Sequence, residues 1–174
     1  IQQLLERLEG LGLEVRMAAP DHGPLWRRGL DPIFGWYQHW AAQAPTRKAV
    51  VLYDTMWGST DLMARSIGEG LAEVGAEVKL MPLSGSHRSD VAAEVLEAGA
   101  LVVGSPTLNN QMFPTVADAT TYLKGLKPKH LVGATFGSFG WSGEAIKHLD
   151  ALLEEMGIEN LGHVRTQYVP KAEI

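Results

Sequence analysis

The stretch Asp54-Thr55-Met56-Trp57-Gly58-Ser59-Thr60-Asp61 joins an apolar run to a helical pattern. Residues 49–53 before it are short and rich in valine, as in a buried parallel strand, and residues 62–72 after it carry apolar side chains at helical spacing. N–H groups at the start of a helix have no intrahelical partner and carry partial positive charge. This strand–turn–helix unit predicts an α/β fold with an anion site at the turn.

The composition of the turn narrows the choice of anion. It has no lysine after its glycine, unlike the loops that hold nucleotide triphosphates, and it lacks the G-x-G-x-x-G pattern of dinucleotide sites. Its donors are neutral: the hydroxyl groups of Thr55, Ser59 and Thr60, and backbone groups around Gly58, where a missing side chain allows close approach. Such a turn suits one terminal phosphate, such as that of FMN. The alternative is a helix without a ligand, capped by Ser59 or Thr60.

Composition excludes several classes of function. The 174 residues have a net charge of −5, which argues against a general nucleic-acid binder, and no cysteine, which excludes disulfides, thiolate metal sites and cysteine nucleophiles. No stretch has the apolar length of a membrane span, and the first residues do not resemble a signal peptide. We therefore expect a cytoplasmic protein with no membrane partner. Because the chain begins at Ile1, we also expect residues to be missing before it.

Strand and helix patterns alternate from residue 49 onward. The expected strands are residues 49–53, 77–81, 100–104, 130–136 and 161–169, and the expected helices after the first are residues 89–98, 114–125 and 142–156. This alternation predicts a doubly wound, five-stranded parallel sheet. A closing helix is expected after Pro170, so we expect the C-terminal end to be cut as well.

The first 46 residues follow a different pattern. Residues 1–10 predict the end of an amphipathic helix, and the alternation of residues 13–18 predicts a strand. Residues 30–44 predict a helix with an aromatic stripe, which is more typical of a packing surface than of a ligand site. A linker around Pro45 places the domain boundary between residues 1–46 and residues 47–174.

Three loops follow the carboxyl ends of predicted strands: the turn described above, residues 105–111, and residues 137–143. In an open parallel sheet, ligands bind at this edge near the switch in strand order. The third loop carries Phe139 and Trp141 among three glycines, which would offer a flat ring a stacking surface and backbone groups along its edge. The alternative is that the two aromatic side chains cap the core and the glycines serve turns.

Together these loops resemble the FMN loops of the flavodoxin-like domain in flavodiiron proteins, a family of oxygen and nitric oxide reductases. The resemblance covers residues 47–171 and implies the flavodoxin strand order 2-1-3-4-5. It implies that the FMN phosphate is held by Thr55, Met56, Trp57, Gly58, Ser59 and Thr60. It also implies that the isoalloxazine is flanked by Pro106, Thr107, Leu108, Asn109 and Asn110 and by Ser138, Phe139, Gly140, Trp141, Ser142 and Gly143. Further implications are rubredoxin or a similar electron donor and a head-to-tail homodimer, in which one subunit's FMN lies beside the other's metals.

The resemblance extends upstream to residues 20–24, which resemble the end of the family's metallo-β-lactamase-like domain. It implies that residues 1–46 are the remnant of that domain with the linker, and that His22 is one ligand of a di-iron centre in the parent protein. The family's earlier ligand run, His-x-Glu-x-Asp-His, does not occur in the 174 residues, and the other histidines have no such spacing. By itself, the chain is therefore expected to carry electrons rather than to reduce oxygen or nitric oxide.

Two other functions remain open from the sequence. A flavodoxin-like NAD(P)H:quinone reductase would keep FMN and add a nicotinamide site. A regulatory α/β module without flavin would need clustered carboxylates after the first strand, where Asp54 and Asp61 are sparse. No side chain is a candidate acid, base or nucleophile, because Ser142 does not lie in a G-x-S-x-G elbow.

Overall fold

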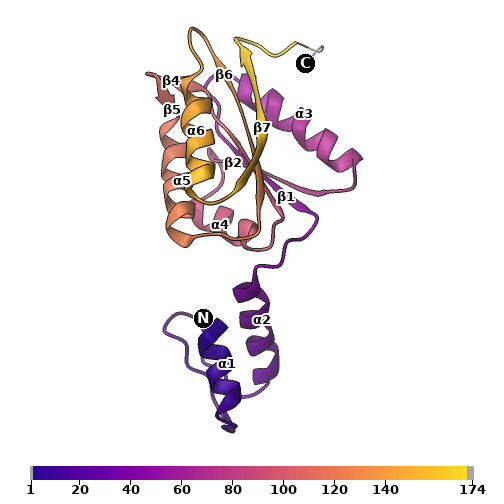
Figure 1. Cartoon of the computed structure of the whole chain (residues 1–174), viewed down its shortest axis with the longest axis vertical. Helices are drawn as coiled ribbons and strands as arrows, with labels where there is room; N and C mark the ends of the chain where they lie inside the picture. The colour runs from indigo at the N-terminus through magenta and orange to yellow at the C-terminus, as the bar shows by residue number, and fades with distance from the viewer. Residues whose placement is uncertain (1, 172–174) are drawn as a thin grey trace. The chain divides into compact units, whose positions relative to one another are not determined.

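The computed structural model describes residues 2–171 and divides the chain into two compact units, residues 1–44 and residues 45–174. The strands of the main sheet, all in the second unit, are β1 (Lys48–Tyr53), β2 (Glu77–Pro82), β3 (Ala100–Gly104), β6 (Val132–Phe139) and β7 (Glu159–Gln167). They pair in the order β2-β1-β3-β6-β7, and every pair is parallel (Figure 1). Numbered among themselves, these strands have the order 2-1-3-4-5, so the predicted flavodoxin-like sheet is confirmed.

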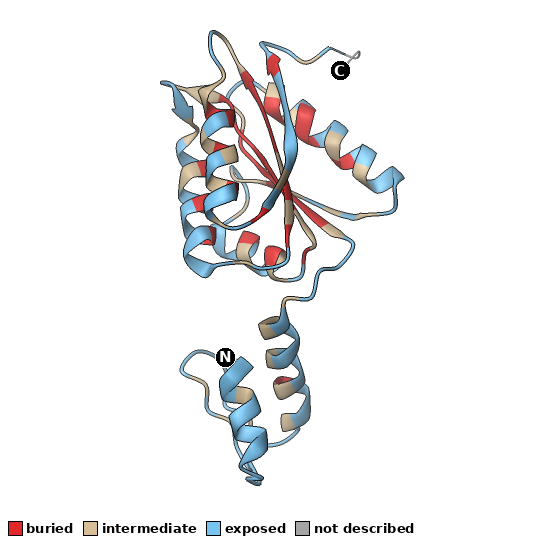
Figure 2. Ribbon diagram, viewed as in Figure 1, coloured by how far each residue is buried: buried red, intermediate tan, exposed pale blue. Residues whose placement is uncertain are grey.

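Helices cover both faces of the sheet: α3 (Ser59–Glu73), α4 (Arg88–Leu96), α5 (Pro114–Leu126) and α6 (Glu144–Glu155). The last three share one core with side chains such as Leu52 and Leu101, whereas α3 packs on the other face against Val51 and Phe136. The central strands β1 and β3 are buried almost throughout, as continuous apolar runs require (Figure 2). No helix of the described residues is long and apolar enough to cross a membrane.

The smaller unit contains α1 (Gln2–Gly10) and α2 (Leu30–Ala42). The strand predicted at residues 13–18 is wrong. Only Ala18 makes a bridge, an antiparallel one with Trp26, and Leu13, Val15 and Met17 are exposed. Alternating apolar residues form a strand only where a partner strand and a core are available, and this segment has neither along most of its length.

A short hairpin interrupts the second loop. It pairs β4 (Thr107–Leu108) with β5 (Gln111–Met112), and the sequence did not predict it. The two residues between these strands, Asn109 and Asn110, have φ angles of 51° and 61°. A two-residue hairpin turn of type I′ has left-handed backbone at both central positions, and asparagine adopts that conformation more readily than most residues.

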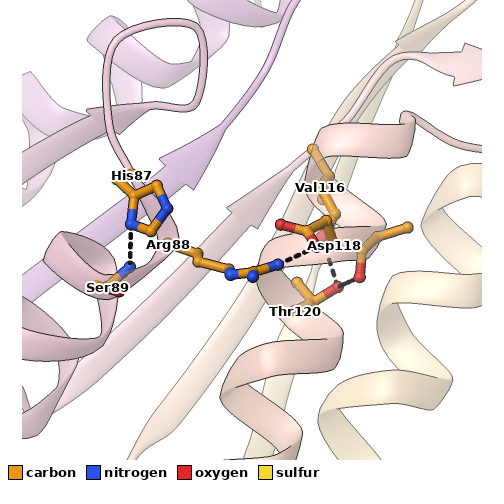
Figure 3. Close-up of polar contacts among 7 residues, drawn as sticks. His87, Arg88, Ser89, Val116, Asp118 and Thr120 are labelled. Carbon is orange, nitrogen blue, oxygen red and sulfur yellow. Dashed lines mark hydrogen bonds and ion pairs between the residues drawn. The ribbon is translucent and has the colours of Figure 1, made fainter.

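Helices α4 and α5 are joined near their N-terminal ends. Arg88 Nη1 lies 2.6 Å from Asp118 Oδ1, and His87 Nδ1 accepts a 3.3 Å hydrogen bond from the N–H of Ser89, which makes His87 the N-cap of α4 (Figure 3). Two residues farther along α5, the hydroxyl of Thr120 donates to the carbonyl of Val116 at 2.6 Å, so that its bond stays within the helix (Figure 3). The Arg88–Asp118 pair is exposed and contributes little stability.

Candidate functional site

The turn between β1 and α3 starts the helix without a side-chain cap. Gly58 is the N-cap, with a left-handed φ of 86°, so the alternative in which Ser59 or Thr60 caps the helix is wrong. The first intrahelical bond runs from Leu62 N to Gly58 O at 3.0 Å. The N–H groups of Ser59, Thr60 and Asp61 come before that bond and have no carbonyl of the helix within reach. An anion placed there would accept their hydrogen bonds.

The space around Gly58 is open. A Cβ atom built on this glycine would meet nothing within 4 Å. The hydroxyl oxygen of Thr55 accepts a 3.0 Å hydrogen bond from the N–H of Gly58, which leaves the hydroxyl hydrogen of Thr55 able to donate elsewhere. The turn therefore combines free neutral donors with unfilled space, and this combination fits a phosphate group.

A pocket of about 400 Å³ lies where the three loops meet. Its lining consists of Met56, Trp57, Ser59, Pro106, Thr107, Ser138, Phe139, Gly140, Trp141, Tyr168 and Val169. The volume is in the range of small-molecule sites, which are mostly apolar with a few placed polar groups. The side chains of Trp57 and Trp141 are 91% and 93% exposed, so their ring faces are available for stacking.

The structure thus brings together side chains from all three predicted loops, but some predicted residues do not line the pocket. In the turn these are Thr55, Gly58 and Thr60; in the second loop Leu108, Asn109 and Asn110; in the third Ser142 and Gly143. Leu108 to Asn110 lie at the end of the hairpin, and the Thr60 side chain is fully buried. Direct contact of these residues with a cofactor stays a prediction.

Two lining residues, Tyr168 and Val169, were not predicted. They follow β7 at the same edge of the sheet as the three loops. The N–H of Tyr168 donates to Phe139 O at 2.8 Å, and Gln167 Nε2 donates to Gly140 O at 2.8 Å. These bonds hold the end of β7 against the third loop. The signal in the sequence was the position of Tyr168 at the end of the fifth strand, because all carboxyl ends of a parallel sheet meet at one edge.

The loops are also tied to one another by buried hydroxyl groups. Ser105 Oγ accepts the N–H of Phe113 at 2.8 Å and so closes the base of the second loop. The hydroxyls of Thr60 and Ser138 lie 3.1 Å apart and join the start of α3 to the end of β6, which extends to Phe139 and so includes the first three residues of the predicted third loop. Both bonds are made between protein groups, so the walls of the pocket are fixed without the help of a ligand.

A carboxylate in the first turn of α3, that of Asp61, is engaged by two other side chains. Asp61 Oδ2 accepts from Arg65 Nε at 2.8 Å and Oδ1 accepts from the Tyr53 hydroxyl at 2.5 Å; these bonds, in that order, lower the pKa of Asp61. Burial, and next the bond to Asp61, raise the pKa of Tyr53 to about 12. Tyr53 therefore remains a donor at neutral pH and helps to hold the Asp61 carboxylate in place.

No group of three or more histidine, cysteine, aspartate or glutamate side chains within residues 2–171 is arranged to hold a metal ion. His22 is an exposed residue of the smaller unit. Its assignment as a di-iron ligand concerns a longer protein and stays a prediction.

Comparisons with known proteins agree on one group of relatives. The flavodoxin family model matches residues 51–173. A nitric oxide reductase of Moorella thermoacetica is 42% identical over 175 residues, which cover 99% of this chain and 44% of the relative. The structure of the rubredoxin oxygen:oxidoreductase of Desulfovibrio gigas is 41% identical, with a TM-score of 0.93 over 98% of this chain and 43% of the other. A flavodiiron protein of Giardia intestinalis is 28% identical, with a TM-score of 0.88 over 99% and 44%. The chain spans less than half the length of each.

Proposed function

The chain belongs to the flavodoxin family, and we propose that it is the FMN-binding, electron-transferring part of a flavodiiron oxygen or nitric oxide reductase. The observation that carries the proposal is the pocket, which combines free helix N–H groups with exposed aromatic rings at the edge where three loops meet. The names of the relatives, nitric oxide reductase and rubredoxin oxygen:oxidoreductase, support it.

The residues of the pocket would divide the binding of FMN between them. The N–H groups of Ser59, Thr60 and Asp61, with the hydroxyl of Thr55, would hold the phosphate. Stacking and edge contacts to the isoalloxazine would come from the second and third loops and from Tyr168. When bound, the flavin supplies the redox chemistry, and the protein binds and orients it and limits its access to water.

The remaining parts of the proposal concern the longer protein. Residues 1–46 would be the remnant of a metallo-β-lactamase-like domain with its linker, residues 47–174 the flavodoxin-like domain, and His22 one ligand of a di-iron centre. Rubredoxin or a similar protein would donate electrons, oxygen or nitric oxide would accept them, and the full-length protein would act as a cytoplasmic head-to-tail homodimer. This assignment is supported by the relatives named nitric oxide reductase and rubredoxin oxygen:oxidoreductase, of whose lengths the chain covers 44% and 43%.

The flavin that the chain binds is expected to be FMN. The pocket has one site for an anion, and the sequence has no adenine-binding fingerprint, so FAD would leave half of its structure without contacts. The purified chain should be heated and the released flavin separated by chromatography beside FMN, FAD and riboflavin standards. Release of FAD, or of no flavin even after incubation with FMN, would contradict the proposed function.

The 174 residues alone are expected to accept electrons into bound flavin but not to sustain nitric oxide consumption, and to reduce oxygen only as slowly as free flavin. A di-iron site needs about four or more ligands per iron, and one histidine cannot supply them. The test is to reduce the chain anaerobically and follow nitric oxide with an electrode, with and without ferrous iron. The control is His22→Ala, which should behave the same. Sustained turnover that is lost in the His22→Ala variant would mean that His22 has found other ligands.

A further inference from the structure

A buried carboxylate lies at the base of the turn but outside the pocket. Asp54 is 6% exposed and is not among the lining residues. Its Oδ1 accepts the N–H of Thr55 at 2.7 Å, and its Oδ2 accepts the hydroxyl of Thr115 at 2.5 Å. Burying a carboxylate is unfavourable unless it is hydrogen-bonded, and bonds to a charged acceptor are stronger than neutral ones. Both oxygens of Asp54 are therefore committed to holding two other residues.

Thr115 connects this carboxylate to the second loop. It is the second residue of α5, whose N-cap, Phe113, is bonded to Ser105 at the base of that loop. Asp54 directly follows β1, and Ser105 directly follows the neighbouring strand β3. The Asp54–Thr115 bond therefore connects the residue that follows β1 to the first turn of α5, the helix that follows the second loop.

The same carboxylate reaches the phosphate donors through Thr55. Asp54 holds the N–H of Thr55, and the hydroxyl of Thr55 in turn accepts the N–H of Gly58 at 3.0 Å. Gly58 has the left-handed backbone that starts α3. A chain of hydrogen bonds therefore runs from Thr115 through Asp54 and Thr55 to the residue that sets the direction of the free N–H groups.

We propose that Asp54 and Thr115 are positioning residues for the FMN phosphate. Their hydrogen bond holds the turn in the conformation that leaves the N–H groups of residues 59–61 free, although neither side chain lines the pocket. The inference rests on the proposed function. Because the chain of hydrogen bonds ends at Gly58, directly before the N–H groups of residues 59–61, the largest effect is expected on the phosphate. Loss of the bond should therefore weaken binding of FMN much more than binding of riboflavin, which has the same ring and no phosphate.

The test compares the affinities of five apo-proteins, the wild type and four variants, for FMN and for riboflavin, measured by quenching of flavin fluorescence. Thr115→Val removes the hydroxyl at nearly constant volume and is expected to lower the affinity for FMN about tenfold, with a much smaller change in the affinity for riboflavin. Thr115→Ser keeps a hydroxyl and should restore the wild-type affinity. Thr120→Val is the matched control: Thr120 lies on the same helix, but its hydroxyl bonds only to carbonyls of α5, Val116 O at 2.6 Å and Ala117 O at 3.3 Å (Figure 3).

The outcomes separate the inference from the function on which it rests. If the wild type prefers FMN to riboflavin and Thr115→Val retains that preference in full, the inference is overturned, as it is if both affinities fall equally. If the wild type has no preference for FMN, the proposed function is overturned and the inference with it. Thr115 is exposed, so its replacement leaves no buried cavity. Thr115→Ala, which also favours the helix, removes the same hydroxyl and must give the same selective loss.

Discussion

Replacing Gly137 with alanine is expected to destabilise the larger unit by about 3 kcal/mol. A Cβ atom at this position would lie 2.0 Å from the carbonyl oxygen of Ser105 and 3.2 Å from Ile146 Cδ1. The carbonyl belongs to the backbone that leaves β3, and Ser105 N is itself bonded to Phe136 O at 3.0 Å. It cannot rotate away as a side chain would, so β3 and β6 would have to separate where the second and third loops begin.

The matched control is Gly140→Ala, three residues farther along. A Cβ atom there would lie 3.7 Å from the ring of Tyr168, an ordinary contact, so we expect a change of less than about 1 kcal/mol in either direction. The free energy of unfolding of both variants is measured by urea denaturation followed by circular dichroism, and both the midpoint and the m-value are compared. Equal stabilities of the two variants would mean that the strands are not packed as closely as the structure has them.

Gly58→Val is expected to lower the affinity for FMN about 100-fold, against about fivefold for Ser59→Ala. Alanine at position 59 removes one neutral hydroxyl, which contributes about 1 kcal/mol. Valine at position 58 would place a branched side chain in the space that the phosphate needs and would strain a backbone with φ of 86°. Several of the N–H donors that follow would then lose their alignment at once.

The control for backbone strain is Gly157→Val. Gly157 has a φ of 72°, and a Cβ atom built on it would meet nothing within 4 Å. It follows the C-terminal end of α6, whereas the third loop precedes the N-terminal end of that helix. Valine there imposes similar strain away from the pocket and should leave the affinity for FMN unchanged. Titration of each apo-protein with FMN gives the comparison. Similar affinities for Gly58→Val and Ser59→Ala would contradict the role assigned to the turn.

The strands of the main sheet could be predicted because the central ones have a simple pattern, whereas their order was implied by the resemblance to flavodiiron proteins. Residues 100–104 are continuously apolar since both faces of β3 are covered, and they form a strand with the predicted bounds. Residues 13–17 alternate regularly between apolar and charged residues, which is also a strand pattern, but residues 13–18 form no strand. Whether a strand forms depends on a partner, and a pattern within six residues holds no information about a partner elsewhere.

The site was predicted where its chemistry is local and missed where it depends on tertiary contacts. Glycines and hydroxyls at strand ends indicated the three loops. Tyr168 looked like the continuation of a strand, and its left-handed φ of 60° accompanies a hydrogen bond to Phe139, which is distant in sequence. The cap at Gly58 was missed for a related reason: serine and threonine are common N-caps, but here the hydroxyl of Thr60 is engaged with Ser138.

The five tryptophans give each unit its own optical signal. Trp26, Trp36 and Trp40 lie against one another in the smaller unit, with ring centroids 5.7 Å and 6.3 Å apart along the series. The larger unit has only Trp57 and Trp141, both lining the pocket and almost fully in water. A tryptophan in water emits at longer wavelength than one among apolar rings, and Trp36 is only 45% exposed, so the red edge of the emission spectrum is expected to come mainly from Trp57 and Trp141. A flavin bound in the pocket would quench the emission at that edge first, so the tryptophan spectrum reports separately on the two units.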